Sequence, residues 1–257
     1  MFGESLHKPV WRAVAGAELT PIAERAFPAL QASRDWARYR SAVDPLYGRW
    51  LAKNGLTRSA FGPQDLESNQ TARATLANSV GEEKFVFIEP WVVQMLYPVR
   101  LLNLHKSEGL RILDLGSGGG HFSLLCEVLG HDVLGVDLRN ETFDTICEAL
   151  GVRRRIATVT PTYFDEKPER YDLILGLRVN FNIVGESVWE EEAWTHFVET
   201  AVRRLTPAGR LALLLNTQPN KTGPTVKNRR LPAHLLRLGF SLHAIDNSPF
   251  MVRRNAS

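Results

Sequence analysis

A glycine-rich stretch between an apolar run and a helical stretch constrains the fold of this chain more than any other feature. Residues 114–120 read DLGSGGG, at the end of an apolar run that begins at residue 110, and a helical stretch at 121–129 follows directly. Glycines let the backbone adopt positive φ and approach a ligand without an intervening side chain. The helix that follows presents unpaired N–H groups at its start. This context predicts an α/β fold with a ligand site at the turn.

Segments typical of strands and helices alternate from residue 110 onward. Strands are expected at 110–115, 132–136, 155–160, 171–177 and 210–215, with helices at 121–129, 141–150, 188–205 and 231–238. This alternation is typical of a parallel sheet covered by helices on both faces. The last two apolar runs, 240–245 and 250–253, are joined by DNSP alone. A connection this short makes a hairpin, so one of these strands must run antiparallel.

The first 80 or so residues lack the alternation of strands. Segments at 28–40 and 45–54 carry aromatic and apolar residues at helical spacing, and Pro45, Gly55 and Gly81 are expected to divide them into short helices. A further helix is expected at 89–105, with a kink or a break near Tyr97 because Pro98 lies inside it. We therefore predict a helical N-terminal cap over residues 1–88 and a ligand-binding domain over 89–257.

A second acidic residue stands at the end of the second predicted strand. Residues 133–137 read VLGVD, and Asp137 follows Gly116 by 21 positions. An acid at this point accepts hydrogen bonds from the ribose hydroxyls of a nucleotide-like ligand. A helix begins shortly afterwards, so Asp137 as a helix N-cap remains an alternative. Asp114 has its own alternative, a structural carboxylate that holds the turn through backbone N–H groups.

Together these motifs resemble the class I S-adenosylmethionine-dependent methyltransferases. DLGSGGG is similar to their first motif and Asp137 to the ribose-binding acid of the second. YDLILG at 171–176 is similar to the fourth-strand motif, and LTPAGR at 205–210 to the turn into the fifth strand. The resemblance extends over residues 89–254. It implies a Rossmann-like, mostly parallel seven-stranded sheet of order 3-2-1-4-5-7-6 whose last strand is antiparallel.

The same resemblance implies S-adenosyl-L-methionine as cofactor. Asp137 would hold the ribose and Leu138 would pack on the adenine. Many members place an acid after the third strand to bind the adenine amino group, but residues 159–164 (VTPTYF) have none there, and Thr162 or a backbone carbonyl near Tyr163 is expected to substitute. The implied cofactor-binding residues are Asp114, Gly116, Ser117, Gly118, Gly120, His121, Asp137, Leu138, Thr162 and Leu177.

Methyl transfer from a sulfonium is an in-line displacement, so the protein mainly has to align the reacting atoms. The loop after the fourth predicted strand reads GLRVNFN at 176–182 and lacks the Asn/Asp-Pro-Pro-Tyr/Phe of members that methylate amino groups of adenine or glutamine. The catalytic candidates are Arg178, Asn180 and His196, each with an ordinary structural role as the alternative. No His, Asp or Glu cluster has metal-ligand spacing, so no metal is expected.

We therefore predict methylation of a small molecule at oxygen or nitrogen, with residues 1–80 as a lid over the acceptor. Deleting this lid is expected to abolish acceptor turnover and to leave cofactor binding intact. Three alternatives remain open. A dinucleotide enzyme of NAD type would need a glycine at position 121, which is His121. An RNA methyltransferase and a non-catalytic binding module are the other two.

Charge and cysteine usage bear on the partners. The net charge is +3, and residues 217–257 carry seven Lys or Arg against one acid, so the tail is either a solvated basic edge or a surface for an anionic partner such as RNA. The two cysteines, Cys126 and Cys147, do not indicate a disulfide framework. No signal peptide or membrane span is recognised. These features predict a cytoplasmic protein without a membrane partner, and leave the oligomeric state open.

Overall fold

The computed structural model describes residues 18–58, 75–76, 78–162, 170–178, 183–184, 187–215, 230–245 and 248–255. The chain divides into two compact units. The helical unit comprises Met1–Glu108, Gly118–Leu129 and Arg139–Arg153, and the sheet unit comprises Gly109–Ser117, Gly130–Leu138 and Arg154–Ser257. The predicted domain boundary at residue 88 stays a prediction. No helix among the described residues has the length and apolar character needed to cross a bilayer.

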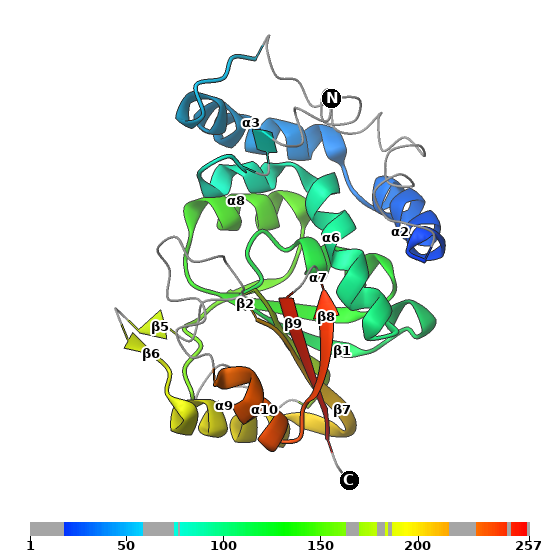
Figure 1. The fold of residues 1–257 in the computed structure, drawn as a ribbon. Coiled ribbons are helices and arrows are strands. Elements are labelled where there is room, and N and C mark those ends of the chain that lie inside the picture. Colours follow the sequence, from blue (N-terminus) through cyan, green and yellow to red (C-terminus); the bar gives the residue numbers. More distant parts are fainter. Residues whose placement is uncertain are drawn as a thin grey trace. The chain divides into compact units, whose positions relative to one another are not determined.

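The sheet unit is built on one seven-stranded sheet (Figure 1). Its strands lie in the order β3-β2-β1-β4-β7-β9-β8, and this is order 3-2-1-4-5-7-6 when the seven are counted along the chain, as predicted. Their bounds are β1 Arg111–Leu115, β2 Asp132–Asp137, β3 Arg154–Ile156, β4 Tyr171–Leu177, β7 Leu205–Leu214, β8 Ser241–Ile245 and β9 Ser248–Arg254. A separate two-stranded pair joins β5, Ile183–Val184, to β6, Ser187–Val188.

The pairing of the strands confirms the predicted hairpin. β1, β2, β3, β4 and β7 run parallel to one another, whereas β9 is antiparallel to both β7 and β8. Ile245 of β8 pairs directly with Ser248 of β9, so two residues connect the strands. The red and orange strands of Figure 1 show this pair at one edge of the sheet. The α/β, Rossmann-like fold class predicted from the sequence is therefore confirmed.

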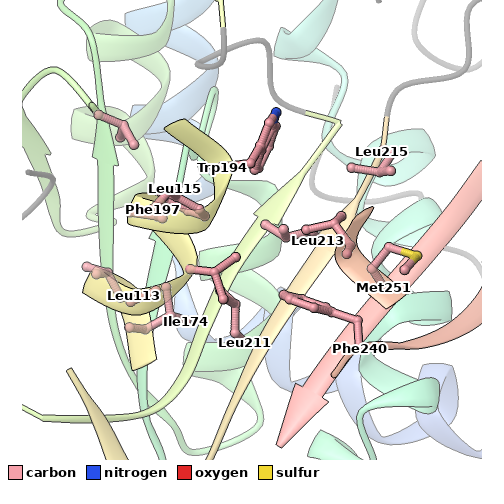
Figure 2. Packing of buried hydrophobic residues seen from close by; sticks show 14 of the residues in the cluster. Leu113, Leu115, Ile174, Trp194, Phe197, Leu211, Leu213, Leu215, Phe240 and Met251 are labelled. Atoms are coloured by element: carbon pink, nitrogen blue, oxygen red, sulfur yellow. The ribbon is translucent and has the colours of Figure 1, made fainter. Parts of the chain in front are cut away.

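A hydrophobic core joins the sheet to two helices of the same unit, α9 (Glu191–Arg203) and α10 (Leu231–Arg237). Figure 2 shows Trp194 and Phe197 of α9 turned toward this core. Phe197 is fully buried, and so is Leu211 of β7. Burying such side chains stabilises the fold by about 1.5–3 kcal/mol each relative to exposure. The apolar run of β7 is thus explained by burial.

The helical unit contains α2 (Thr20–Ser33), α3 (Trp36–Lys53), η1 (Glu82–Val86), α6 (Ile88–Leu101), η2 (Leu104–Lys106), α7 (His121–Val128) and α8 (Glu141–Leu150). α3 packs against α8 and η1, and α2 packs against α6 and α7 (Figure 1). Tyr39 and Trp50 of α3 are fully buried, and Trp50 contacts Phe87 edge-on at 4.9 Å between ring centroids. The described N-terminal helices therefore supply core to the unit that also contains α7 and α8.

Several boundaries differ from the sequence expectation. The expected helical segment 28–40 is divided between α2 and α3, and the helix expected at 188–205 is α9, which begins at Glu191. α3 continues through Pro45, because one face carries the buried Tyr39, Val43, Leu46 and Trp50 on both sides of the proline. α6 continues past Tyr97 to Leu101, so the alternative of a break at Pro98 is wrong. β3 is shorter and begins earlier than the predicted 155–160, and β7 begins at Leu205 instead of residue 210. Tertiary packing and strand pairing set these limits, and local propensity cannot supply them.

Candidate functional site

The turn after β1 is held against the end of β2. The Gly116 N–H donates to the carbonyl oxygen of Val136 at 2.7 Å, and the Ser117 N–H donates to the same oxygen at 3.3 Å. Gly116 has φ of 69°, a left-handed conformation that glycine adopts without strain. The turn therefore leaves the sheet beside the last residue of β2, which is Asp137. Asp114 lies before it in β1, buried, between Gly135 and Leu175 of the neighbouring strands.

In the helical unit, the second part of the glycine stretch packs closely against α8. Gly120 is the N-cap of α7 with φ of 76°, and a Cβ placed there would lie 3.1 Å from both Cys147 Sγ and Val152 Cγ1. Both the backbone conformation and the space thus require glycine. At Gly118, by contrast, an added Cβ would meet only Phe143 Cζ, at 3.9 Å. Gly118 has φ of 53°, so glycine is favoured there by the backbone conformation, whereas at Gly120 close packing adds a second reason.

Asp137 ends β2 with a carboxylate that is part-exposed. Its Oδ1 accepts a hydrogen bond from the Leu138 N–H at 2.8 Å. The N-cap of α8 is Asn140, whose side-chain oxygen accepts from the Phe143 N–H at 3.0 Å. The alternative in which Asp137 caps this helix is therefore wrong. The carboxylate stands at the carboxyl edge of the parallel strands, where ligands bind in open α/β sheets.

Two large apolar side chains adjoin this acid and are exposed. Leu138 is 57% exposed and Ile156 is 40% exposed. Ile156 is the register partner of Asp137 on β3, so the two residues sit side by side at the strand ends. An exposed apolar pair beside a carboxylate suits a flat heterocycle joined to a polar sugar. Sequence analysis identified Leu138 but missed Ile156, because the predicted third strand extended beyond it.

Thr162, predicted to substitute for the acid that binds the adenine amino group in many members of the family, is exposed. Tyr163 lies outside the described residues. Leu177 is part-buried at the end of β4 beside Leu214 of β7. The sheet unit thus brings Asp114, Gly116, Ser117, Asp137, Leu138 and Leu177 to neighbouring strand ends. Gly118, Gly120 and His121 belong to the helical unit.

His121 is buried in the helical unit. Its Nε2 lies 2.9 Å from the carbonyl oxygen of Phe85, which can only accept, so Nε2 carries the hydrogen. Burial lowers the pKa of His121 to about 4, although the Phe85 carbonyl opposes this shift. The imidazole is therefore neutral near pH 7 and offers no positive charge to an anion. Its predicted contact with the cofactor stays a prediction.

The Phe85 ring lies beside His121, with 6.1 Å between ring centroids, and belongs to an aromatic cluster of the same unit. Phe85 of η1 lies 4.5 Å from Trp91 and 5.5 Å from Phe143 between ring centroids, and Lys84 Nζ lies 5.8 Å from the Trp91 ring centre. η1 is also tied to α8 by a hydrogen bond from Asn140 Nδ2 to Glu82 Oε2 at 2.5 Å. The 3-10 segment η1 thus contacts the first turns of both α7 and α8. Sequence analysis gave no signal for this segment.

The three catalytic candidates lie in different settings. Arg178 follows β4 directly, is exposed, and has a positive φ of 55°, while its N–H donates to the Leu214 carbonyl. His196 is exposed on α9. Asn180 lies outside the described residues. Among the described residues, no group of three or more His, Cys, Asp or Glu side chains is arranged to hold a metal ion.

Comparison with known proteins gives one short sequence match and many similar structures. No family model matches the chain. Over 78 residues the chain is 40% identical to a ubiquinone biosynthesis O-methyltransferase of Sinorhizobium medicae (strain WSM419). The match spans 28% of this chain and 30% of that protein, so the chain matches less than a third of its relative's length.

Among solved structures, the chain is similar to CalS10, an S-adenosylmethionine-bound amino pentose methyltransferase from Micromonospora echinaspora. The TM-score is 0.51 at 14% identity, over 72% of this chain and 96% of that one. A second similar structure is the 16S rRNA N2 G1207 methyltransferase RsmC of T. thermophilus, with a TM-score of 0.45 at 20% identity over 70% of this chain and 44% of that one. At 14% identity, the similarity to CalS10 shows that the two chains share a fold and nothing more.

Proposed function

Because the chain has the fold of the class I S-adenosylmethionine-dependent methyltransferases, we propose that it is a methyltransferase that uses this cofactor. One observation carries the proposal. The Val136 carbonyl accepts from Gly116 and Ser117, and this brings the glycine turn alongside Asp137 at the carboxyl ends of β1 and β2. Bare backbone and a carboxylate side by side at this edge suit an adenosyl ligand with free ribose hydroxyls.

The residues present fit the adenosyl group. The Asp137 carboxylate would accept hydrogen bonds from ribose hydroxyls, and its part-exposed position leaves it accessible. Leu138 and Ile156 would cover the adenine, because they are exposed apolar side chains beside that carboxylate. Stacking on side chains of this kind does not depend on an acid after β3. The proposal therefore needs no substitute for the acid that residues 159–164 lack.

When bound, the cofactor supplies an electrophilic methyl group on a sulfonium. The protein has to hold the acceptor in line with the methyl–sulfur bond and to keep water away. Arg178 is the candidate for holding the acceptor, because it directly follows β4, which pairs with β1.

For the acceptor, we propose a small molecule methylated at oxygen. The support is the 78-residue match to a protein named as a ubiquinone biosynthesis O-methyltransferase. Methylation at nitrogen is the second candidate, as for an amino sugar.

The lid role of residues 1–80 is part of this proposal, but deletion is a poor test of it. α2 and α3 bury Leu19, Leu30, Tyr39 and Trp50 completely, so a deletion removes core from the helical unit.

The alternatives are separable. Dinucleotide-binding sheets of NAD enzymes have the strand order 3-2-1-4-5-6. Here the order is 3-2-1-4-5-7-6 and β9 is antiparallel to β7, which disfavours an NAD enzyme. An RNA methyltransferase would bind RNA with strong salt dependence. Three of the seven basic residues of the tail, Lys221, Lys227 and Arg229, lie outside the described residues. Arg237, within them, contacts Glu191 at 3.0 Å. A non-catalytic module would bind the cofactor without any product.

Calorimetry with S-adenosylhomocysteine and with NAD tests the cofactor, and labelled methyl transfer to quinol and amino sugar panels tests the acceptor. Asp137→Asn should weaken S-adenosylhomocysteine binding about 10- to 100-fold, because it replaces the charged acceptor by a neutral amide that offers one accepting oxygen instead of two. Asp132→Asn is the matched control, since Asp132 is an exposed acid at the opposite end of β2. Unchanged affinity in Asp137→Asn, or tighter binding of NAD, would show that the proposal is wrong.

A further inference from the structure

An arginine with a nearly buried side chain lies beside the acid proposed to hold the ribose. Arg154 is the first residue of β3, and its side chain is only 5% exposed. Its Nη2 donates to the carbonyl oxygen of Leu138 at 2.6 Å and lies 4.0 Å from Oδ2 of Asp137. All three residues belong to the sheet unit. One guanidinium therefore contacts both the backbone and the charge of the turn that ends β2.

The register of β2 and β3 explains how Arg154 reaches this turn. Arg154 pairs with Gly135, which lies two residues before Asp137 on the same strand. Residues two apart on a strand face the same side of the sheet. Gly135 has no side chain on that side, so the arginine can extend along β2 toward the strand end. In the sequence alone, residues 153–155 are three consecutive arginines with nothing to single out the middle one.

Burying a guanidinium is costly unless hydrogen bonds and an opposite charge compensate it. The Leu138 carbonyl supplies a short hydrogen bond, and Asp137 supplies the charge. At 4.0 Å the contact with Oδ2 is longer than a hydrogen bond, so Arg154 acts on the carboxylate through its charge. It does not use up an acceptor position of that oxygen, which is where a ribose hydroxyl would donate.

We propose that Arg154 is a positioning residue for the cofactor site. It fixes the Leu138 carbonyl, and with it the Asp137–Leu138 turn, and its positive charge attracts the Asp137 carboxylate, whose Oδ2 lies 4.0 Å away. The N–H of Leu138 orients Oδ1 from the other side at 2.8 Å. This inference rests on the proposed function, because Asp137 is taken as the ribose acid. Arg154 itself touches no ligand in this account.

A double-mutant cycle measured by calorimetry with S-adenosylhomocysteine tests the proposal. Arg154→Met and Arg154→Lys are compared in the wild-type background and in Asp137→Asn. Arg154→Met should weaken binding about 5- to 50-fold in the wild type and less than about 3-fold in Asp137→Asn, because its effect passes through the carboxylate. Arg154→Lys keeps the charge and should recover part of the loss. Arg155→Met, on the next residue of β3, is the matched control and should leave affinity unchanged.

The outcomes separate this inference from the proposed function. If S-adenosylhomocysteine does not bind the wild-type protein, the proposed function is wrong. If it binds, and Arg154→Met weakens it equally in both backgrounds, Arg154 supports only the local fold and the inference is wrong. A second ligand, the 2′-deoxy analogue, gives a readout that general destabilisation would not move. Arg154→Met should reduce the preference for S-adenosylhomocysteine over its 2′-deoxy analogue. If Arg154→Met does not fold, Arg154→Lys serves for both measurements.

Discussion

The buried imidazole of His121 donates a hydrogen bond from Nε2 to the carbonyl oxygen of Phe85, over 2.9 Å. This bond joins the first residue of α7 to η1, a segment 36 positions earlier in the chain. It fixes the tautomer of the ring. It also means that the residue after the glycine stretch is held by the N-terminal part of the helical unit.

The stability of the protein should depend on pH through His121. Its pKa is lowered from 6.5 to about 4 by burial, so the unfolded chain binds a proton as the pH falls through 6.5 while the folded chain does not. Stability is therefore lost as the pH falls from about 6.5 to about 4, by about 3 kcal/mol in all, and the loss levels off below that.

Urea denaturation at pH 7.5 and at pH 5 measures this effect. His121→Gln removes the titration and retains an N–H donor, so it should lose about 2 kcal/mol less than the wild type between the two pH values. His196→Gln, at an exposed position of α9, is the control and should behave as the wild type. Equal pH dependence in all three proteins would contradict the assignment.

The order of the sheet was implied by the family resemblance, and the individual strands, helices and hairpin were predicted from local signals. The four residues DNSP permit only a hairpin, and β8 and β9 form one. Strands and helices beside clear stops, such as α8 before Gly151, were placed within a residue or two. The helix break expected at Pro45 was wrong, because buried residues on one face of α3, before and after the proline, hold the helix together. Such burial depends on partners distant in the chain.

The candidate site was predictable only in part, for the same reason. Asp137 and the glycine turn are adjacent to strong strand signals and could be read directly. Arg154 and Ile156 gain their places from the register of β3 against β2, which the sequence does not specify. Phe85 reaches His121 through a 3-10 segment with no periodic pattern. Contacts of this kind arise from tertiary structure alone.

Gly120 should tolerate alanine less well than a glycine of similar backbone conformation. Gly120 and Gly151 have φ of 76° and 66°, but only at Gly120 would a Cβ meet side chains at 3.1 Å, whereas at Gly151 nothing lies within 4 Å. Gly151→Ala should cost about 1 kcal/mol from backbone strain, and Gly120→Ala about 2–4 kcal/mol because crowding is added. Urea denaturation of both variants checks the difference, and equal losses would show that packing at Gly120 is unimportant.

The phenol of Tyr39 should contribute to the stability of the helical unit. Its hydroxyl donates to the Val86 carbonyl at 2.9 Å, and complete burial raises the pKa of this phenol, so it remains a donor at ordinary pH. Tyr39→Phe removes the donor and leaves a buried carbonyl without it, which should cost about 1–2 kcal/mol in urea denaturation. Tyr97→Phe, at a half-buried position of α6, should change stability by less than about 0.5 kcal/mol. A neutral Tyr39→Phe would show that the bond contributes nothing.

Arg178 should affect acceptor turnover without being needed for stability. It and Asn103 are the two non-glycine residues with positive φ in the part of the chain that the structure describes, at 55° and 54°. Such a conformation costs about 1 kcal/mol or more in a residue with a Cβ, and strain of this kind concentrates at functional sites. Replacing either residue by glycine relieves the strain, so both Arg178→Gly and Asn103→Gly should be as stable as the wild type or more stable by up to about 1 kcal/mol.

The two variants should differ in catalysis. If the Arg178 side chain holds the acceptor, Arg178→Gly raises the acceptor KM about tenfold or more and leaves S-adenosylhomocysteine affinity unchanged, because a charged hydrogen bond to the acceptor is lost. Asn103→Gly, which lies between α6 and η2, should leave both quantities unchanged. Steady-state kinetics on the acceptor identified in the methyl-transfer panel, with calorimetry alongside, measures both. An unchanged KM in a stable Arg178→Gly protein would remove Arg178 from the acceptor site and leave its conformation as a feature of the β4 turn alone.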